Sequence, residues 1–279
     1  MMTDEKHVTL RNGVVMPILG LGTSGNPQPV NYDTTLHAIR HCGYRLIDTA
    51  QVYGSEQHVG EAVRESSVPR EEMFLTSKLG WRYYELQTAE RETKSSLEKL
   101  NTDYFDLFLL HWPGAKSDEE LFEAWRFMEL LLEKEETRAI GVSNFLPRHL
   151  DKLLDNSCVV PFVNQCEFHI YQNDKELRNY CAENKIRFDG WSPLGKGKQV
   201  LDDPFVKEIS KYHNKTPAQV LVRWSIQNDV VTIPKSTKKH RVEENCLVWD
   251  FLLSEKEMDT LNNLHQNLRL GICDPSNVP

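Results

Sequence analysis

The chain has 279 residues, of which 39% are hydrophobic and 27% are charged, a composition typical of a folded globular protein. Its net charge of −8 argues against a nucleic acid or an anionic membrane as partner. The sequence contains no apolar run long enough to predict a transmembrane helix. Residues 1–6 lack the apolar core of a signal peptide. Six well-separated cysteines without a Cys-x-x-Cys pair predict reduced thiols in a cytoplasmic protein.

Short apolar segments separated by turn residues predict β-strands along the whole chain. Residues 8–10 and 14–16 flank Asn12-Gly13 and predict an N-terminal β-hairpin. The segment at 188–192 has the weakest strand pattern, because Arg187 and Asp189 interrupt its apolar run. The eight strands predicted after the hairpin are 18–22, 46–48, 74–78, 105–111, 138–143, 162–165, 188–192 and 230–234.

Helical patterns fill the gaps between these strands. Ser117-Asp118-Glu119-Glu120 resembles a capping box ahead of a stripe at helical spacing. Alternating strands and helices predict a parallel sheet, and eight such units in this length predict a closed (β/α)8 TIM barrel. Residues 1–279 are then one domain, with a doubly wound sheet as the alternative. The helical positions are Leu121, Trp125, Met128 and Leu132; Leu36 and Ile39; Leu97 and Leu100; and the run from Pro217 through Val220, Leu221 and Trp224.

Two glycine-rich segments match phosphate-binding motifs only in part. The segment 20–25 reads G-x-G-x-x-G, but Asn26-Pro27-Gln28-Pro29 follows it and the next helix starts near Tyr32, so the Rossmann interpretation is disfavoured. The segment 190–196 reads G-x-x-x-x-G-K, but Gly197 stands where Mg²⁺ binding needs Ser or Thr. No metal-ligand set is predicted. The first segment is interpreted as a glycine-rich barrel loop, and the second can still offer backbone N–H groups to a phosphate.

Polar residues close several of the predicted strands, where a barrel places its active site. Asp48, Lys78 and His111 end the second, third and fourth strands, and Tyr53 follows the second. The ammonium of Lys78 would lower the pKa of a neighbouring phenol, Asp48 would hold the lysine, and His111 could donate to a carbonyl oxygen. Each residue alone is typical of a solvated charge or a structural histidine, but the set predicts a site that protonates carbonyl groups.

A basic cluster follows the eighth strand. Residues 235–241 hold five side chains that carry or can carry positive charge, so this acidic protein has one local site for an anion. A solvated helix entrance and a nuclear-localisation patch are the alternative interpretations.

Several ordered segments together resemble the aldo-keto reductase family, particularly its shorter members of the diketogluconate-reductase and prostaglandin F synthase type. The matches extend from residue 20 to residue 245. They are Asp48-Thr49-Ala50-x-x-Tyr53-Gly54, Leu109-Leu110-His111-Trp112-Pro113, Gly141-Val142-Ser143-Asn144-Phe145, Ser192-Pro193-Leu194-Gly195, Ile233-Pro234-Lys235-Ser236 and Arg241-x-x-Glu244-Asn245.

The resemblance implies NADPH bound across the strand ends of the barrel. It assigns Tyr53 as the general acid, Lys78 and Asp48 as groups that tune it, and His111 as the group that orients the carbonyl. Trp191 would stack on the nicotinamide, and Lys235, Ser236 and Arg241 would hold the 2′-phosphate. The full set of implied cofactor residues is Gly22, Thr23, Asp48, Ser143, Asn144, Gln165, Trp191, Ser192, Leu194, Gly195, Lys235, Ser236, Thr237, Arg241, Glu244 and Asn245.

The chain departs from better-known members at two positions. Ser24 replaces a frequent tryptophan and Trp191 replaces a frequent tyrosine, which leaves the substrate open. The expected pocket wall is Ser24, Val52, Tyr53, Trp81, His111 and Trp112. The sequence thus predicts a monomeric, cytoplasmic NADPH-dependent reductase of small aldehydes or ketones, partnered with neither nucleic acid nor membrane. A Schiff-base enzyme using Lys78 and a non-catalytic NADPH-binding subunit are the alternatives.

Overall fold

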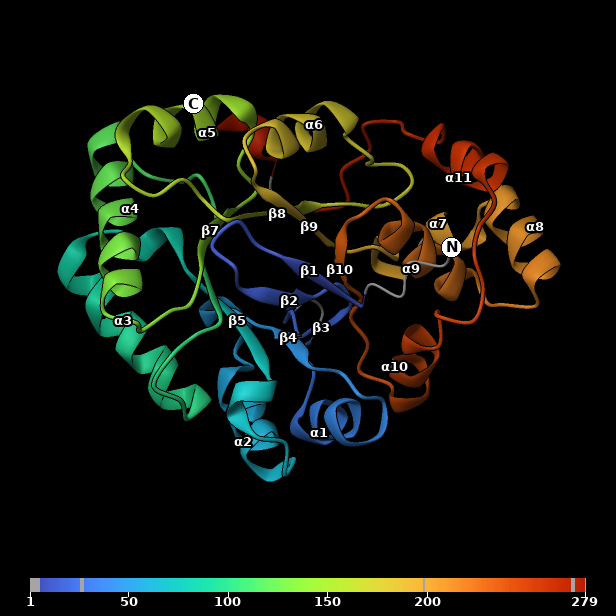
Figure 1. Cartoon of the computed structure of the whole chain (residues 1–279), viewed down its shortest axis with the longest axis horizontal. Helices are drawn as coiled ribbons and strands as arrows, with labels where there is room; N and C mark the ends of the chain where they lie inside the picture. The colour runs from blue at the N-terminus through green and yellow to red at the C-terminus, as the bar shows by residue number, and fades with distance from the viewer. Residues whose placement is uncertain (1–5, 26–27, 198, 272–273, 279) are drawn as a thin grey trace.

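The computed structural model describes residues 6–25, 28–197, 199–271 and 274–278, and its centre is a ring of parallel strands with helices outside (Figure 1). Each strand pairs in parallel with the next along the chain, which confirms the predicted (β/α)8 barrel and excludes the doubly wound sheet. The strands are β3 (Gly20–Gly22), β4 (Leu46–Asp48), β5 (Phe74–Leu79), β6 (Leu107–Leu110), β7 (Ile140–Ser143), β8 (Val163–Glu167), β9 (Arg187–Trp191) and β10 (Val231–Ile233).

The first and last barrel strands meet and close the ring. The backbone N–H of Thr232 donates to the carbonyl of Ile18 at 2.8 Å, and that of Gly22 donates to Pro234 at 3.2 Å. A β-carbon at Gly22 would lie 2.7 Å from the Ile233 carbonyl oxygen, so this position needs a glycine. Closure brings the carboxyl ends of all eight strands to one rim.

The predicted N-terminal hairpin forms, and it covers the end of the barrel opposite the carboxyl rim. Strands β1 (His7–Thr9) and β2 (Val15–Pro17) pair antiparallel, and Gly13 adopts the positive φ of 86° that ends their turn. The side chain of Asn12 donates to the carbonyl of Arg138, just before β7, at 3.0 Å. Figure 1 shows the hairpin lying across the middle of the ring. The site therefore opens at the carboxyl rim.

Helices surround the barrel and begin at polar caps. The hydroxyl of Ser117 accepts from the Glu120 N–H, but the Glu120 carboxylate accepts from the Lys116 N–H, so only one half of the expected capping box forms. Thr216 and Gln219 form a complete box. The helices are α1 (Tyr32–His41), α2 (Glu56–Glu65), α3 (Leu86–Leu100), α4 (Asp118–Glu133), α5 (Pro147–Asn156), α6 (Lys175–Glu183), α7 (Gln199–Asp202), α8 (Pro204–His213), α9 (Pro217–Gln227), α10 (Lys239–Cys246) and α11 (Glu255–Asn262).

The observed strands differ from the predicted ones by at most two residues at either end, and β4 matches its prediction. Phe105 makes only an isolated bridge to Thr137, and His111 lies just beyond the end of β6. The interrupted segment at 187–191 is nevertheless a strand, because Asp189 points into the barrel and is hydrogen-bonded there. No helix in the described ranges is long and apolar enough to cross a membrane. The five cysteines within the same ranges are free, and Cys273 lies outside them.

Candidate active site

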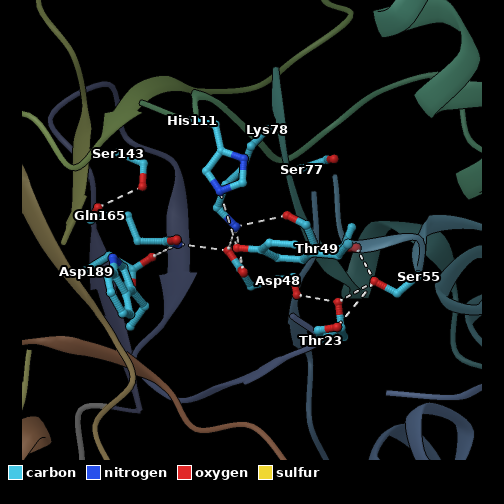
Figure 2. A network of polar contacts seen from close by, with 12 residues as sticks. Thr23, Asp48, Thr49, Ser55, Ser77, Lys78, His111, Ser143, Gln165 and Asp189 are labelled. Atoms are coloured by element: carbon cyan, nitrogen blue, oxygen red, sulfur yellow. Dashed lines mark hydrogen bonds and ion pairs between the residues drawn. The ribbon is translucent and has the colours of Figure 1, made fainter. Parts of the chain in front are cut away.

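The carboxyl rim of the barrel brings together the four predicted catalytic residues. Asp48 ends β4, Lys78 lies near the end of β5, and His111 directly follows β6. Tyr53 ends the short 3-10 helix η1 (Gln51–Tyr53), which follows β4. Figure 2 shows Asp48, Lys78 and His111 converging on one network of polar contacts.

Lys78 and Asp48 form a buried ion pair beneath the rim. The Lys78 Nζ donates to Asp48 Oδ1 and Oδ2 at 2.7 and 2.8 Å and to the Thr49 carbonyl at 2.9 Å. Burial lowers the pKa of Lys78, but Asp48 and other acidic neighbours more than offset this, and the net shift is upward. Lys78 therefore remains an ammonium at neutral pH.

Tyr53 stands above this ion pair. The Lys78 Nζ lies 5.0 Å from the centre of the Tyr53 ring, and the Tyr53 Oη lies 3.5 Å from His111 Nε2. Lys78 lowers the pKa of Tyr53, as expected from the sequence, but burial is the larger cause and the net pKa is raised. The effect of Lys78 thus has the expected direction, but burial outweighs it, so the phenol keeps its proton.

His111 is neutral at physiological pH. Burial, assisted by the charge of Lys78, lowers its pKa to about 3. Its ring stands edge-on to that of Tyr53, with the centres 5.5 Å apart. The Nδ1 atom is buried and has no hydrogen-bond partner among the described residues. Because an orphaned donor is rarer than an orphaned acceptor, the proton belongs on Nε2, the atom beside Tyr53.

Predicted nicotinamide-binding residues line the neighbouring strand ends. The Asn144 side chain donates to Ser143 Oγ at 2.9 Å and to the His111 carbonyl at 3.2 Å, and it accepts from Trp191 Nε1 at 3.0 Å. Asn144 adopts a positive φ of 65°, a conformation asparagine tolerates better than most residues. The half-buried Trp191 ring is thus fixed at the rim by Asn144. Gln165 lies on β8 and contacts the acidic groups described below.

Two further groups of predicted cofactor residues lie outside the basic cluster. Ser192, Leu194 and Gly195 make the turn after β9, where Ser192 and Gly195 have positive φ. Thr23 follows Gly22 and is fully buried. Its hydroxyl donates to the Asp48 carbonyl at 2.9 Å and lies 3.0 Å from Ser55 Oγ, so this hydroxyl is already hydrogen-bonded within the protein.

The basic cluster lies at the entrance of α10. Lys235 donates to the Gln28 carbonyl at 2.9 Å, and Ser236 Oγ accepts from the Lys238 N–H at 3.0 Å. Arg241 is exposed. Of the other predicted contacts, Thr237 is half-buried, Asn245 is buried, and Glu244 accepts from Thr216 Oγ1 at 2.7 Å.

A cavity of about 210 Å³ lies along the segments that follow Asp48 and Lys78 in the chain, although neither Tyr53 nor His111 lines it. It is lined by Val52, Gly80, Trp81, Arg82 and Tyr83, which include two of the residues predicted for the pocket wall. Trp112 does not line this cavity, but Trp112 and Trp81 both pack around Gly114. Ser24 is half-buried and precedes Gly25, which approaches the Tyr53 carbonyl.

Sequence reasoning missed the role of Asp189, which it treated only as an interruption of a strand. The side chain is 1% exposed and its Oδ2 accepts from Gln165 Nε2 at 2.7 Å. The available signal was its position two residues before Trp191, which places both on the same face of β9. A second cavity, of about 450 Å³, lies at the hairpin end and contains none of the predicted catalytic residues. In the described ranges no acidic, cysteine or histidine cluster could hold a metal ion.

The sequence matches the family described as Aldo/keto reductase family over residues 18–266, and the chain belongs to it. It is therefore an oxidoreductase of a family that uses NADP(H). A 9,11-endoperoxide prostaglandin H2 reductase of Trypanosoma cruzi is 44% identical over 275 residues, covering 97% of this chain and 95% of the relative. A glyoxal reductase of Bacillus subtilis is 44% identical over 264 residues, covering 95% and 94%.

A solved structure with NADP bound has the same fold. The Bombyx mori aldo-keto reductase in complex with NADP aligns with a TM-score of 0.89 and 31% identity, covering 98% of this chain and 97% of that one. The side chains at the rim fit a pyridine nucleotide: an aromatic face at Trp191, amides at Asn144 and Gln165, and a cationic entrance at Arg241.

Proposed function

We propose that the chain reduces small aldehydes or ketones to alcohols, with Tyr53 as the proton donor. The observation that carries this proposal is the 3.5 Å separation between the Tyr53 Oη and the His111 Nε2, above the buried Lys78. A carbonyl oxygen that faces both atoms at hydrogen-bond distance would meet two donors at once.

Tyr53 supplies the proton that the product alcohol needs. Its raised pKa keeps the phenol protonated through neutral pH. As the proton leaves the Oη, negative charge develops beside the ammonium of Lys78, which stabilises the phenolate more than the phenol. Asp48 keeps that ammonium in place, and neutral His111 donates from Nε2 to orient the carbonyl.

NADPH, when bound, supplies the hydride for the carbonyl carbon. Trp191 would carry the nicotinamide face, with Ser143, Asn144 and Gln165 at its amide. Lys235, Ser236 and Arg241 would hold the 2′-phosphate, because guanidinium and ammonium groups bind phosphate through charge-assisted hydrogen bonds.

The cavity lined by Val52, the neighbour of Tyr53 in the chain, supports a small substrate. Its volume of about 210 Å³ and its lining of Val52, Trp81 and Tyr83 suit a short carbonyl compound with an apolar or aromatic part. Glyoxal, the substrate in the name of a relative, is the first to test.

The deciding experiment follows NADPH oxidation by absorbance over a panel of dicarbonyls, aldehydes, keto-sugars and quinones. Tyr53→Phe removes only the phenolic oxygen, so turnover should fall at least a hundredfold while NADPH binding, read by fluorescence, persists. Tyr212→Phe, at an exposed tyrosine of α8, is the matched control and should behave as the wild type. Normal turnover in Tyr53→Phe would refute the acid assignment.

The Schiff-base alternative is disfavoured by the state of Lys78. Its Nζ has three acceptors within 2.9 Å and a raised pKa, whereas a nucleophilic amine must be unprotonated. Borohydride trapping of a carbonyl compound on Lys78 would support the Schiff-base alternative. A non-catalytic NADPH-binding role would follow from tight binding with no oxidation across the panel. We further propose a monomer in the cytoplasm, a compartment that suits its free thiols.

A further inference from the structure

We propose that Asp189 is a positioning residue of this site, which together with Asp48 fixes the side-chain amide of Gln165 in one orientation. The inference rests on the proposed NADPH-dependent function and adds to it a carboxyl group from β9. Figure 2 shows Gln165 lying between the two carboxyl groups, with a contact to each.

The contacts of Gln165 are directional. Its Nε2 donates to Asp48 Oδ2 at 2.8 Å and to Asp189 Oδ2 at 2.7 Å, so both amide hydrogens are used. The three residues are 1–2% exposed, so water does not compete for these hydrogen bonds. Gln165 and Asp189 are also register partners on β8 and β9, which holds their backbones side by side.

The hydrogen-bonding capacity of the two carboxyl groups determines which end of the Gln165 amide faces them. The ion-paired Asp48 can only accept hydrogen bonds, and a flipped amide would place its oxygen against carboxyl oxygens. The amide oxygen Oε1 of Gln165 is therefore left as an acceptor for another group. The nicotinamide carboxamide carries an N–H donor that suits it.

Asp189 fills this role without adding a second buried negative charge at neutral pH. The groups that face it are Asp48 from β4, Lys78 from β5, Tyr53 from η1 and Gln165 from its own neighbour β8. Burial, with Asp48 as the next cause, raises the pKa of Asp189 to about 8. Within the described part of the chain its buried Oδ1 has no hydrogen-bond partner, which costs more free energy for a charged oxygen than for a neutral carboxyl group. Lys78 thus keeps Asp48 as its single charged partner.

The test compares two cofactors that differ only at the amide: NADP⁺ and its 3-acetylpyridine analogue, in which a methyl group replaces the NH₂. Dissociation constants are measured by protein fluorescence, without turnover. The wild type should bind NADP⁺ about tenfold more tightly, the value of one hydrogen bond of about 1.4 kcal/mol. Asp189→Leu, which removes the acceptor, should reduce this preference to less than about threefold.

Asp189→Asn separates positioning from general damage, because its oxygen can still accept from Gln165 Nε2. This conservative variant should retain the preference of the wild type. Thr232→Val, another change at a buried polar side chain on the neighbouring β10, is the packing control and should also retain it. An unchanged preference in Asp189→Leu, equal loss in Asp189→Asn, or a wild type without preference would overturn the proposal.

Failure of the proposed function would look different. A wild type that discriminates between the two cofactors but oxidises NADPH with no carbonyl compound refutes reduction and leaves the positioning role intact. A wild type that reduces carbonyl compounds while Asp189→Leu keeps its cofactor preference refutes the positioning role alone.

Discussion

Lys78 Nζ lies 2.7 Å from Asp48 Oδ1 in a pair whose side chains are 0% and 3% exposed. Two charges so deeply buried stabilise the fold only while both are present, because either one alone keeps its desolvation cost and loses its partner. The pair thus joins strands β4 and β5 at the point where the proposed acid stands.

Asp48→Asn should destabilise the fold by about 3 kcal/mol, since it leaves the Lys78 ammonium buried without a counter-charge. Urea unfolding measures this loss. Asp202→Asn is the matched control, because Asp202 and Lys207 pair at the same 2.7 Å with side chains 78% and 49% exposed. The control should change stability by less than about 1 kcal/mol. Equal effects of the two substitutions would contradict the argument from burial.

His111 should make the fold sensitive to acid. Its pKa falls from the ordinary 6.5 to about 3 on folding, so the unfolded chain takes up this proton first as the pH drops. The unfolded state then binds more protons, and stability is lost progressively from about pH 6.5 toward pH 3. His111→Asn removes this loss, so its urea midpoint should fall less than that of the wild type between pH 7 and pH 4. His240→Asn, on the exposed surface of α10, should follow the wild type.

The barrel was predictable because its strands leave a strong local signal. Strands buried on both faces read as short apolar runs, and the sequence predicted all eight to within two residues at each end. Their exact ends depend on pairing with neighbours, which the sequence does not carry. Phe105 is one example: it continues the apolar run of β6 but pairs only through an isolated bridge.

The site was predictable where polar residues end successive strands, as at Asp48, Lys78 and His111. The net direction of the shift in the Tyr53 pKa could not be predicted from the sequence. It depends on whether the effect of burial exceeds that of Lys78, and burial is a property of the folded chain. Asp189 was missed for a related reason. A carboxyl group in an apolar run resembles a defect until the structure reveals Gln165 opposite it.

Arg241→Ala should weaken NADPH binding at least tenfold and leave NADH binding nearly unchanged, because only NADPH carries the 2′-phosphate that we assign to this guanidinium. One charge-assisted hydrogen bond contributes about 1.5–3 kcal/mol, which sets the size of the effect. Fluorescence titration with both nucleotides measures it. Arg64→Ala, at an exposed arginine of α2, is the control and should alter neither affinity. Parallel losses for NADPH and NADH would place the phosphate elsewhere.

Asp189→Asn should be more stable than the wild type at pH 8, and the gain should vanish near pH 4. The carboxyl pKa rises from 3.8 to about 8 on folding, so between these values the folded chain binds a proton that the unfolded chain has released. Wild-type stability must then fall as the pH rises, by at most about 1.4 kcal/mol per pH unit for one proton. Asparagine does not titrate, so the stability of the Asp189→Asn variant does not fall for this reason. Urea midpoints of both proteins from pH 4 to pH 8 should diverge steadily, and parallel curves would mean that Asp189 is ionised in the folded chain.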